Sequence, residues 1–215
     1  MNETPPAKAS HLLEWLIWGT LVLTVLAIAS AFIWTRLEDG GIGKTLEIKG
    51  DVPDFTLTNQ FGLPVTLSNL LGHVWVGDVI FTTCPMSCER MTQRMRALQK
   101  EVSPSAGVKF ISLTVNPLFD TPPVLKRYAE RHEVDQSRWN FLTGLKTNVY
   151  DLGINGLKFA VLDNTNRTIP EDLFLHSTQF VLVDKHGKIR AYFEGTDEEE
   201  RKQLFRAVKK LAREK

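Results

Sequence analysis

The stretch from Trp15 to Thr35, "WLIWGTLVLTVLAIASAFIWT", contains no Asp, Glu, Lys or Arg. A helix of roughly 20 residues spans about 30 Å, the thickness of the hydrocarbon core of a bilayer. Tryptophans stand near both ends of the stretch, and transmembrane helices place them at the two membrane interfaces. The sequence therefore predicts one N-terminal transmembrane helix.

Two other interpretations of this stretch are a buried core helix and a cleaved signal peptide. The small residues of "AIASA" offer a cleavage pattern, but the apolar run continues beyond them to Trp34. Lys8 precedes the stretch, and Arg36, Lys44 and Lys49 follow it. Taken alone, this count of cations leans against a cytoplasmic N-terminus.

Composition and patterning predict one globular domain after the apolar helix. The chain has 215 residues, 43% of them hydrophobic, with a formal net charge of +1, and nothing in this balance indicates a nucleic-acid or strongly acidic partner. Gly40, Gly41 and Gly43 loosen the segment between helix and domain. The predicted parts are a polar tail (1–11), the transmembrane helix (12–35), a linker (36–50) and the domain (51–215).

Strand and helix patterns alternate through the domain. Strands or hairpins are expected at 54–67, 74–83, 108–115, 139–144 and 177–195. Helices are expected after Pro85, from about Thr121, in "TNVYDLG" and at the C-terminus, where Thr196 and Glu199 fit a capping box. Residues 154–175 lack a clear period and predict an inserted hairpin or loop. The order indicates an α/β domain with a mixed sheet flanked by helices.

The chain has only two cysteines, Cys84 and Cys88, in "TTCPMSCERM". That is too few for a disulfide-rich scaffold, so the pair points to chemistry. Cys84 stands where a strand turns into a helix, and helix N-termini favour thiolates. Cys88 lies one helical turn later on the same face, so the two sulfurs can form a disulfide or bind one ion. The alternative is a pair of buried, inert cysteines.

A soft ion such as Cu(I) prefers thiolates and completes its shell with imidazole or thioether. Of the five histidines, His176 stands directly before an apolar strand and after the irregular segment. The other four are expected at the surface: His11, His73, His132 and His186. A buried carboxylate is costly, so Asp78, inside an apolar strand, should be paired or near the surface.

The domain resembles the Sco/SenC family of membrane-anchored, thioredoxin-fold copper chaperones for cytochrome c oxidase. The resemblance covers most of residues 51–195, through "PDFTLTNQFGLPVTLSNLLG", "FTTCPMSC", "FISLTVNPLFDTPPVLKRYAER" and "LHSTQFVLVDKHGKIRAYFEG". It implies copper binding by Cys84, Cys88 and His176.

The same resemblance implies that the domain faces the periplasm or the mitochondrial intermembrane space. This orientation is the opposite of the one that the count of cations favours. The implied partners are the copper-bearing oxidase subunit, other copper carriers, thioredoxin-like reductants and the membrane. The chain departs from the family pattern at Glu89, where a proline is frequent, and at Asn116, where Asp is common. Asn116 makes a carboxylate fourth ligand at that position doubtful, although Asp120 is retained.

The sequence is compatible with three functions. The first is copper delivery. The second is an enzymatic thiol–disulfide oxidoreductase, in which Cys84 attacks a target disulfide and Cys88 resolves the mixed disulfide. The third is a peroxiredoxin-like peroxidase, which needs a Thr and an Arg near the cysteine, and Thr82, Thr83 and Arg90 are the candidates. A purely structural, membrane-tethered scaffold has the least support.

Overall fold

The structure is a computed structural model that describes residues 9–39, 46–84, 87–163 and 174–214. Residues Met1–Thr45 and Leu46–Lys215 form two compact units, which are described separately.

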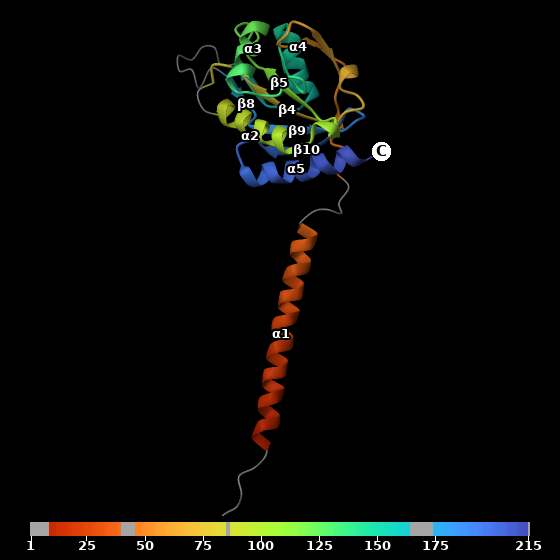
Figure 1. Ribbon diagram of the computed structural model, residues 1–215, viewed down its shortest axis with the longest axis vertical. Coiled ribbons are helices and arrows are strands. Elements are labelled where there is room, and N and C mark those ends of the chain that lie inside the picture. Colours follow the sequence, from red (N-terminus) through yellow and green to blue (C-terminus); the bar gives the residue numbers. More distant parts are fainter. Residues whose placement is uncertain (1–8, 40–45, 85–86, 164–173, 215) are drawn as a thin grey trace, which may run out of the picture. The chain divides into compact units, whose positions relative to one another are not determined.

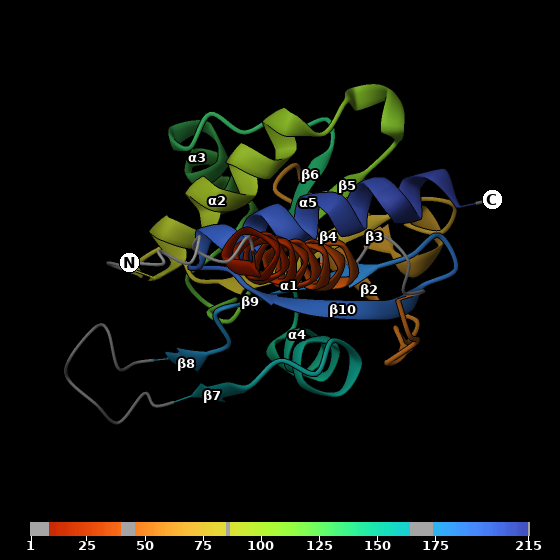
Figure 2. The same cartoon turned by 90° about the horizontal axis from the view of Figure 1, so that it is seen from below.

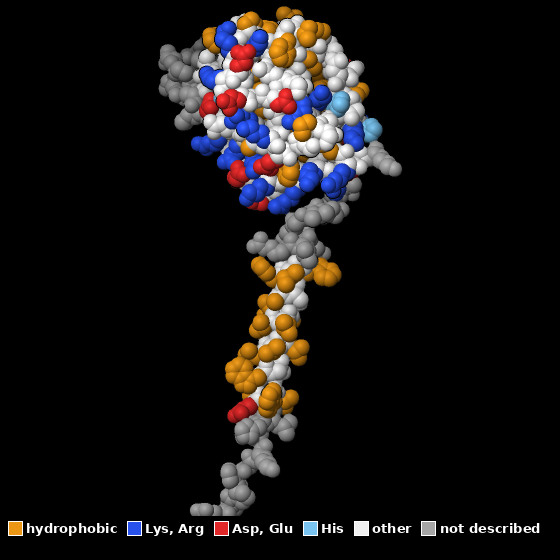
Figure 3. All heavy atoms as spheres, in the orientation of Figure 1, with side chains coloured by type: hydrophobic (Ala, Val, Ile, Leu, Met, Phe, Trp, Pro, Cys, Tyr) orange, Lys and Arg blue, Asp and Glu red, His pale blue; other side chains and the backbone are white. Residues whose placement is uncertain are grey.

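Helix α1 (Ala9–Asp39) is continuous through the apolar stretch (Figure 1). Its span Glu14–Trp34 has 21 residues, a mean hydropathy of 2.3 and exposed, mostly hydrophobic side chains (Figure 3). The hydroxyls of Thr20 and Thr24 donate to backbone carbonyls one turn earlier, at 2.8–3.0 Å. Lipid offers no hydrogen bonds, so such internal pairing suits a membrane. Helix α1 is therefore compatible with a membrane anchor.

The second unit is built on a six-stranded mixed sheet with the order β1-β10-β9-β4-β5-β6. Strands β4, β5 and β6 are parallel, whereas β9 is antiparallel to β4, and β10 is antiparallel to both β9 and β1. The strands are β1 (Gly50–Asp51), β4 (Trp75–Ile80), β5 (Lys109–Thr114), β6 (Trp139–Leu142), β9 (Gln179–Val183) and β10 (Lys188–Glu194).

Helices cover both faces of the sheet. The connections from β4 to β5 and from β5 to β6 contain α2 (Ser87–Glu101) and α3 (Pro122–Arg131), which lie on one face of the sheet (Figure 2). Helix α5 (Glu198–Arg213) shares that face and packs on α2 and β10. Helix α4 (Lys146–Tyr150) and the π-helix η3 (Asp151–Gly156) lie on the other face (Figure 2). The α/β architecture predicted from the sequence is confirmed.

Smaller elements complete the unit. The hairpin expected at 54–67 is formed by β2 (Thr56–Thr58) and β3 (Pro64–Thr66), followed by the 3₁₀-helix η1 (Leu67–Asn69). A second 3₁₀-helix, η2 (Pro104–Ala106), precedes β5. The irregular segment contains a hairpin of β7 (Val161–Asp163) and β8 (Phe174–His176), while its residues 164–173 lie outside the described chain.

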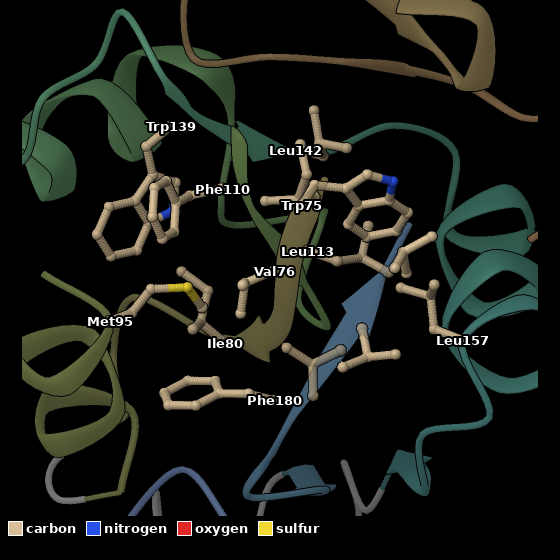
Figure 4. Close-up of a cluster of buried hydrophobic side chains, with 14 of the residues drawn as sticks. Trp75, Val76, Ile80, Met95, Phe110, Leu113, Trp139, Leu142, Leu157 and Phe180 are labelled. Carbon is tan, nitrogen blue, oxygen red and sulfur yellow. The ribbon is translucent and has the colours of Figure 1, made fainter. Parts of the chain in front are cut away.

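The core lies on both sides of β4, all of whose residues are buried. This explains its nearly unbroken apolar sequence, because a strand covered on both faces has no solvent side. Figure 4 shows Met95 of α2 and Leu157, which follows η3, among the side chains gathered around β4 and β5. Trp139 and Phe141 stack with ring centroids 5.2 Å apart, and the Trp139 indole N–H donates to the Ser112 hydroxyl at 2.9 Å.

The predicted capping box of the C-terminal helix is wrong. The N-cap of α5 is Asp197, whose Oδ1 accepts hydrogen bonds from the backbone N–H groups of Glu199 (2.7 Å) and Glu200 (3.1 Å). The Thr196 hydroxyl instead donates to the carboxylate of Glu194 at 2.8 Å. Helix α5 therefore begins after Asp197, one residue later than the capping box requires.

Candidate functional site

Cys84 and Cys88 lie at the carboxyl end of β4, where the chain enters α2. The Cys84 N–H donates to the Phe81 carbonyl oxygen at 3.1 Å, which turns the chain after the strand, and Cys88 is the second residue of α2. Carboxyl ends of parallel strands are the edge where α/β sheets place their ligands. Pro85, after which this helix is expected to begin, lies outside the described residues.

The two cysteines are in contact and differ in exposure. The Cys88 backbone N–H points at the Cys84 sulfur, with 3.4 Å between nitrogen and Sγ, and the Ser87 hydroxyl oxygen lies 3.4 Å from the same sulfur. Cys84 is half-buried, whereas the side chain of Cys88 is buried. The two sulfurs are not joined in a disulfide in this structure. Donors at the start of a helix stabilise a thiolate at Cys84.

The pKa of the Cys88 thiol is raised far above its ordinary value. The largest cause is the hydrogen bond between its thiol and Cys84, followed by burial and by negative charge on Cys84. The two sulfurs therefore do not ionise independently, because charge on one disfavours charge on the other. The arrangement gives an asymmetric pair, in which Cys84 is the more exposed sulfur and the surroundings of Cys88 favour its protonated thiol.

The buried carboxylate of Asp120 connects the loop that carries Cys84 to the end of β5. Asp120 accepts hydrogen bonds from the backbone N–H of Thr82 at 3.2 Å and from the hydroxyls of Thr82 and Thr114. Thr82 precedes Cys84 by two residues, and Thr114 ends β5. Burial raises the pKa of Asp120, and the hydrogen bonds from both threonines oppose that shift. Asp120 is thus a positioning residue for the cysteine loop, and the sequence did not reveal this role.

The backbone of His176 belongs to the β7–β8 hairpin, which precedes β9 in the chain. His176 is the last residue of β8 and pairs with Val161. The register Gly77↔Val181 brings the first residues of β9 level with the end of β4, and His176 lies three residues before Gln179, where β9 begins. Its side chain lies outside what the structure describes. Among the side chains that are described, no group of three His, Cys, Asp or Glu is arranged to hold a metal ion.

The SCO1/SenC family model matches residues 45–213. The chain belongs to the SCO1/SenC family. The SCO1 protein homolog of Bacillus subtilis is 34% identical over 149 residues, which are 68% of this chain and 75% of that protein. The structure of BsSco, a member of the Sco family of cytochrome c oxidase assembly proteins with a disulfide switch, is 31% identical with a TM-score of 0.68 and covers 79% of this chain and 99% of that one.

A more distant structure shares the fold alone. ScoI of Bradyrhizobium japonicum, solved with copper bound, is 21% identical with a TM-score of 0.60, covering 75% of this chain and 99% of that one. The likeness to these structures confirms the thioredoxin-like class of the α/β domain.

In this SCO1/SenC chain, Asp78 is completely buried in β4, opposite Ser112 of β5. Of the two environments expected for Asp78, paired or near the surface, burial excludes the surface. Negative charge on Asp78 contributes to the raised pKa of Cys88, after the contributions of Cys84 and burial. Asp78 thus makes a minor electrostatic contribution to the environment of Cys88.

His132 is buried, so the expectation of a surface position at the end of α3 is wrong. Its ring lies 4.3 Å from the Tyr128 ring, centroid to centroid, and its Nε2 lies 3.4 Å from a carboxylate oxygen of Glu89. Burial lowers the pKa of His132, Glu89 opposes the shift, and Arg131 and Arg96 add to it. Glu89 therefore links the start of α2 to the end of α3. His186 is exposed as expected, and His73 is half-buried with its Nδ1 2.8 Å from the Gly107 carbonyl oxygen.

The buried imidazole predicts a pH dependence of stability. Because the pKa of His132 is lowered in the folded chain, the unfolded chain binds a proton first as the pH falls. The free energy of unfolding should therefore be highest above pH 6.5, the approximate pKa of an unfolded histidine, and should decrease as the pH falls through the folded pKa.

Urea unfolding of the full chain in a mild detergent, followed by tryptophan fluorescence between pH 5 and 8, measures this dependence. His132→Gln should flatten the decrease, whereas His186→Gln, at an exposed position, should retain it. A decrease that persists in His132→Gln would assign it to another group.

Proposed function

We propose that this chain is a membrane-anchored copper chaperone in which Cys84 and Cys88 bind Cu(I) as thiolates, with neutral His176 as the third ligand. The observation that carries the proposal is the contact between the two cysteines at the start of α2. Two thiolates and one imidazole are the soft and intermediate ligands that Cu(I) prefers. The copper-bound structure of a protein with the same fold supports the choice of metal.

The recipient in this proposal is the binuclear copper centre of a cytochrome c oxidase subunit. The assignment of BsSco to the cytochrome c oxidase assembly proteins supports it. Helix α1 would anchor the chain, with residues 1–11 in the cytoplasm, residues 12–35 in the membrane and residues 36–50 as the linker. The domain 51–215 would then face the periplasm, or the intermembrane space in a mitochondrion.

Titration of the reduced full-length chain with Cu(I), in competition with a coloured chelator, tests this proposal. A single high-affinity ion per chain is expected. Cys84→Ser and Cys88→Ser should each abolish binding at the chelator concentration that the wild type withstands, and His176→Ala should weaken it. His186→Ala is the matched control, because this histidine is exposed in the turn between β9 and β10. A reduced wild-type chain that binds no Cu(I) would overturn the proposal.

Thiol–disulfide exchange is the second candidate, favoured by the asymmetry of the pair. The half-buried Cys84 thiolate would attack a target disulfide and release one target sulfur as a thiolate. Cys88, after losing its proton, would then displace the second target sulfur, so that the target gains two electrons and this chain becomes a disulfide. A thioredoxin-like reductant would regenerate the dithiol.

His176→Ala separates the two candidates. Loss of oxidase assembly with retained reduction of a disulfide favours copper delivery, whereas retention of both favours thiol exchange. Peroxide reduction has less support, because the Thr82 hydroxyl is engaged by Asp120 and Arg90 is exposed on α2.

A further inference from the structure

The loop after β5 presents large apolar side chains to solvent. In "VNPLFDTPPV", residues 115–124, the only charged residue is Asp120, and it is buried. Leu118 is 83% exposed and Phe119 is 52% exposed. The neighbouring Pro117 and Pro122 are half-buried, and Pro123 is exposed. Leu118 and Phe119 are called the Leu118–Phe119 surface below.

Single exposed leucines are common in soluble domains, so the exposure of Leu118 does not by itself indicate a binding surface. The position of this surface is more informative. Phe119 directly precedes Asp120, whose carboxylate accepts hydrogen bonds from the backbone N–H and the hydroxyl of Thr82. Strands β4 and β5 are parallel neighbours, so the loops that follow them leave the sheet at the same edge. The Leu118–Phe119 surface therefore lies beside the loop that carries Cys84.

The loop is also held in a defined shape. The backbone N–H groups of Phe119 and Asp120 both donate to the Asn116 carbonyl oxygen, at 3.1 and 2.8 Å. The Asn116 N–H donates to the Thr114 hydroxyl oxygen at 3.0 Å, and the same hydroxyl donates to Asp120. A surface ordered before binding loses little conformational entropy when a partner covers it.

We propose that the Leu118–Phe119 surface is the docking surface for the protein that exchanges copper with Cys84. The inference rests on the proposed function and adds the partner's chemistry: its cysteine-bearing copper site should be bordered by uncharged, apolar side chains. Transfer by ligand exchange requires donor and acceptor sulfurs around one ion, so the acceptor must cover this edge of the sheet. Apolar side chains without neighbouring charges form the centre of such interfaces, because their burial leaves no charge unpaired.

A membrane surface is a less suitable occupant. Residues 115–124 contain no Lys or Arg to attract anionic headgroups. The cations that follow, Lys126 and Arg127, belong to α3.

The test compares Leu118→Ser/Phe119→Ser with Phe61→Ser/Leu63→Ser in the full-length chain in lipid nanodiscs. Phe61 and Leu63 are 49% and 59% exposed. They lie at the opposite edge, because the neighbouring Gln60 donates to the carbonyl oxygen of Trp139, the first residue of β6. Leu118→Lys is a second, milder variant. The Leu118 side chain is 83% exposed, so replacing it removes few contacts within the fold.

Each variant is loaded with Cu(I) and mixed with the soluble copper-site domain of the oxidase subunit from the same source. The rate constant of transfer to this domain should fall at least tenfold in the Leu118→Ser/Phe119→Ser variant and severalfold in Leu118→Lys. Transfer to a small chelator should stay unchanged, and the control variant should match the wild type in both assays.

The outcomes separate the two proposals. Unchanged transfer to the protein acceptor in both Leu118 variants would overturn the docking surface and leave the proposed function intact. A wild-type chain that binds no Cu(I) would overturn the proposed function and this inference with it. Variants that lose binding to anionic vesicles while transferring copper normally would assign the surface to the membrane and overturn the inference.

Discussion

Alanine at position 120 is expected to lower the free energy of unfolding by about 2–4 kcal/mol, because it leaves buried donors without an acceptor. The carboxylate of Asp120 accepts from the Thr82 N–H, the Thr82 hydroxyl and the Thr114 hydroxyl. Each unsatisfied buried donor costs roughly 1–3 kcal/mol, and rotation of the hydroxyls recovers part of that sum. The same change should weaken Cu(I) binding, since Thr82 holds the loop of Cys84.

Urea unfolding of the full-length chain in detergent measures the loss of stability. Asp54→Ala is the matched control, because Asp54 is exposed, and it should change the free energy of unfolding by less than about 0.5 kcal/mol. Asp120→Asn keeps one oxygen acceptor and should cost less than the alanine variant. An alanine variant as stable as the control would show that Asp120 does not hold the loop.

The pH dependence of this cost has a defined sign. Burial raises the pKa of Asp120, so the folded chain binds its proton at a higher pH than the unfolded chain does. Wild-type stability from this group is therefore full below the unfolded pKa and decreases as the pH rises through the folded pKa. Asparagine does not titrate, so the cost of Asp120→Asn should shrink over the same pH range.

Local patterns were sufficient to predict the elements that position the cysteines. The apolar run of β4 and the period of Met91, Met95 and Leu98 in α2 place Cys84 and Cys88 at a strand-to-helix junction. An unbroken apolar run is typical of a strand that is buried on both faces, and a helical spacing of apolar residues is typical of an amphipathic helix. The junction follows from sequence because it needs no partner distant in the chain.

The supports of the site were not predicted, because they depend on tertiary contacts. Asp120 meets Thr82, 38 residues earlier, only after β4 and β5 pair in parallel. The threonines that follow or end these two strands, together with an acid in the next loop, are a signal that could have indicated the contact. His132 was expected at the surface because it stands at a helix end. In the structure α3 packs against β6, and Glu89 of α2 lies close to the His132 ring, so the imidazole is buried.

The choice between adjacent capping residues shows the same limit. Thr196 and Asp197 are both good N-caps, and propensity does not separate them. The Thr196 hydroxyl donates a hydrogen bond to Glu194 at the end of β10, so Asp197 is the N-cap residue of α5. The strand before the helix decides where the helix begins.

The affinity of the reduced chain for Cu(I) should rise steeply with pH, by about tenfold per pH unit for each proton that binding releases. The pKa of Cys88 is raised first by the hydrogen bond with Cys84, then by burial and by charge on Cys84. In the proposed function, copper would have to displace the Cys88 proton throughout the physiological range. A Cu(I) ion bound by both sulfurs would offset the cost of placing two negative charges together.

Asp78→Asn should tighten Cu(I) binding at a fixed pH, since it removes a buried negative charge that contributes to the raised pKa of Cys88. The slope of affinity against pH should stay the same, because Cys88 still has to lose its proton. Competition with a coloured chelator between pH 6 and 8 measures both quantities, and unfolding midpoints confirm that the near-isosteric variant is folded. Asp151→Asn, at an exposed position, is the control and should not change affinity. An affinity independent of pH would mean that the sulfurs are already ionised, and weaker binding in Asp78→Asn would mean that Asp78 supports the bound state directly.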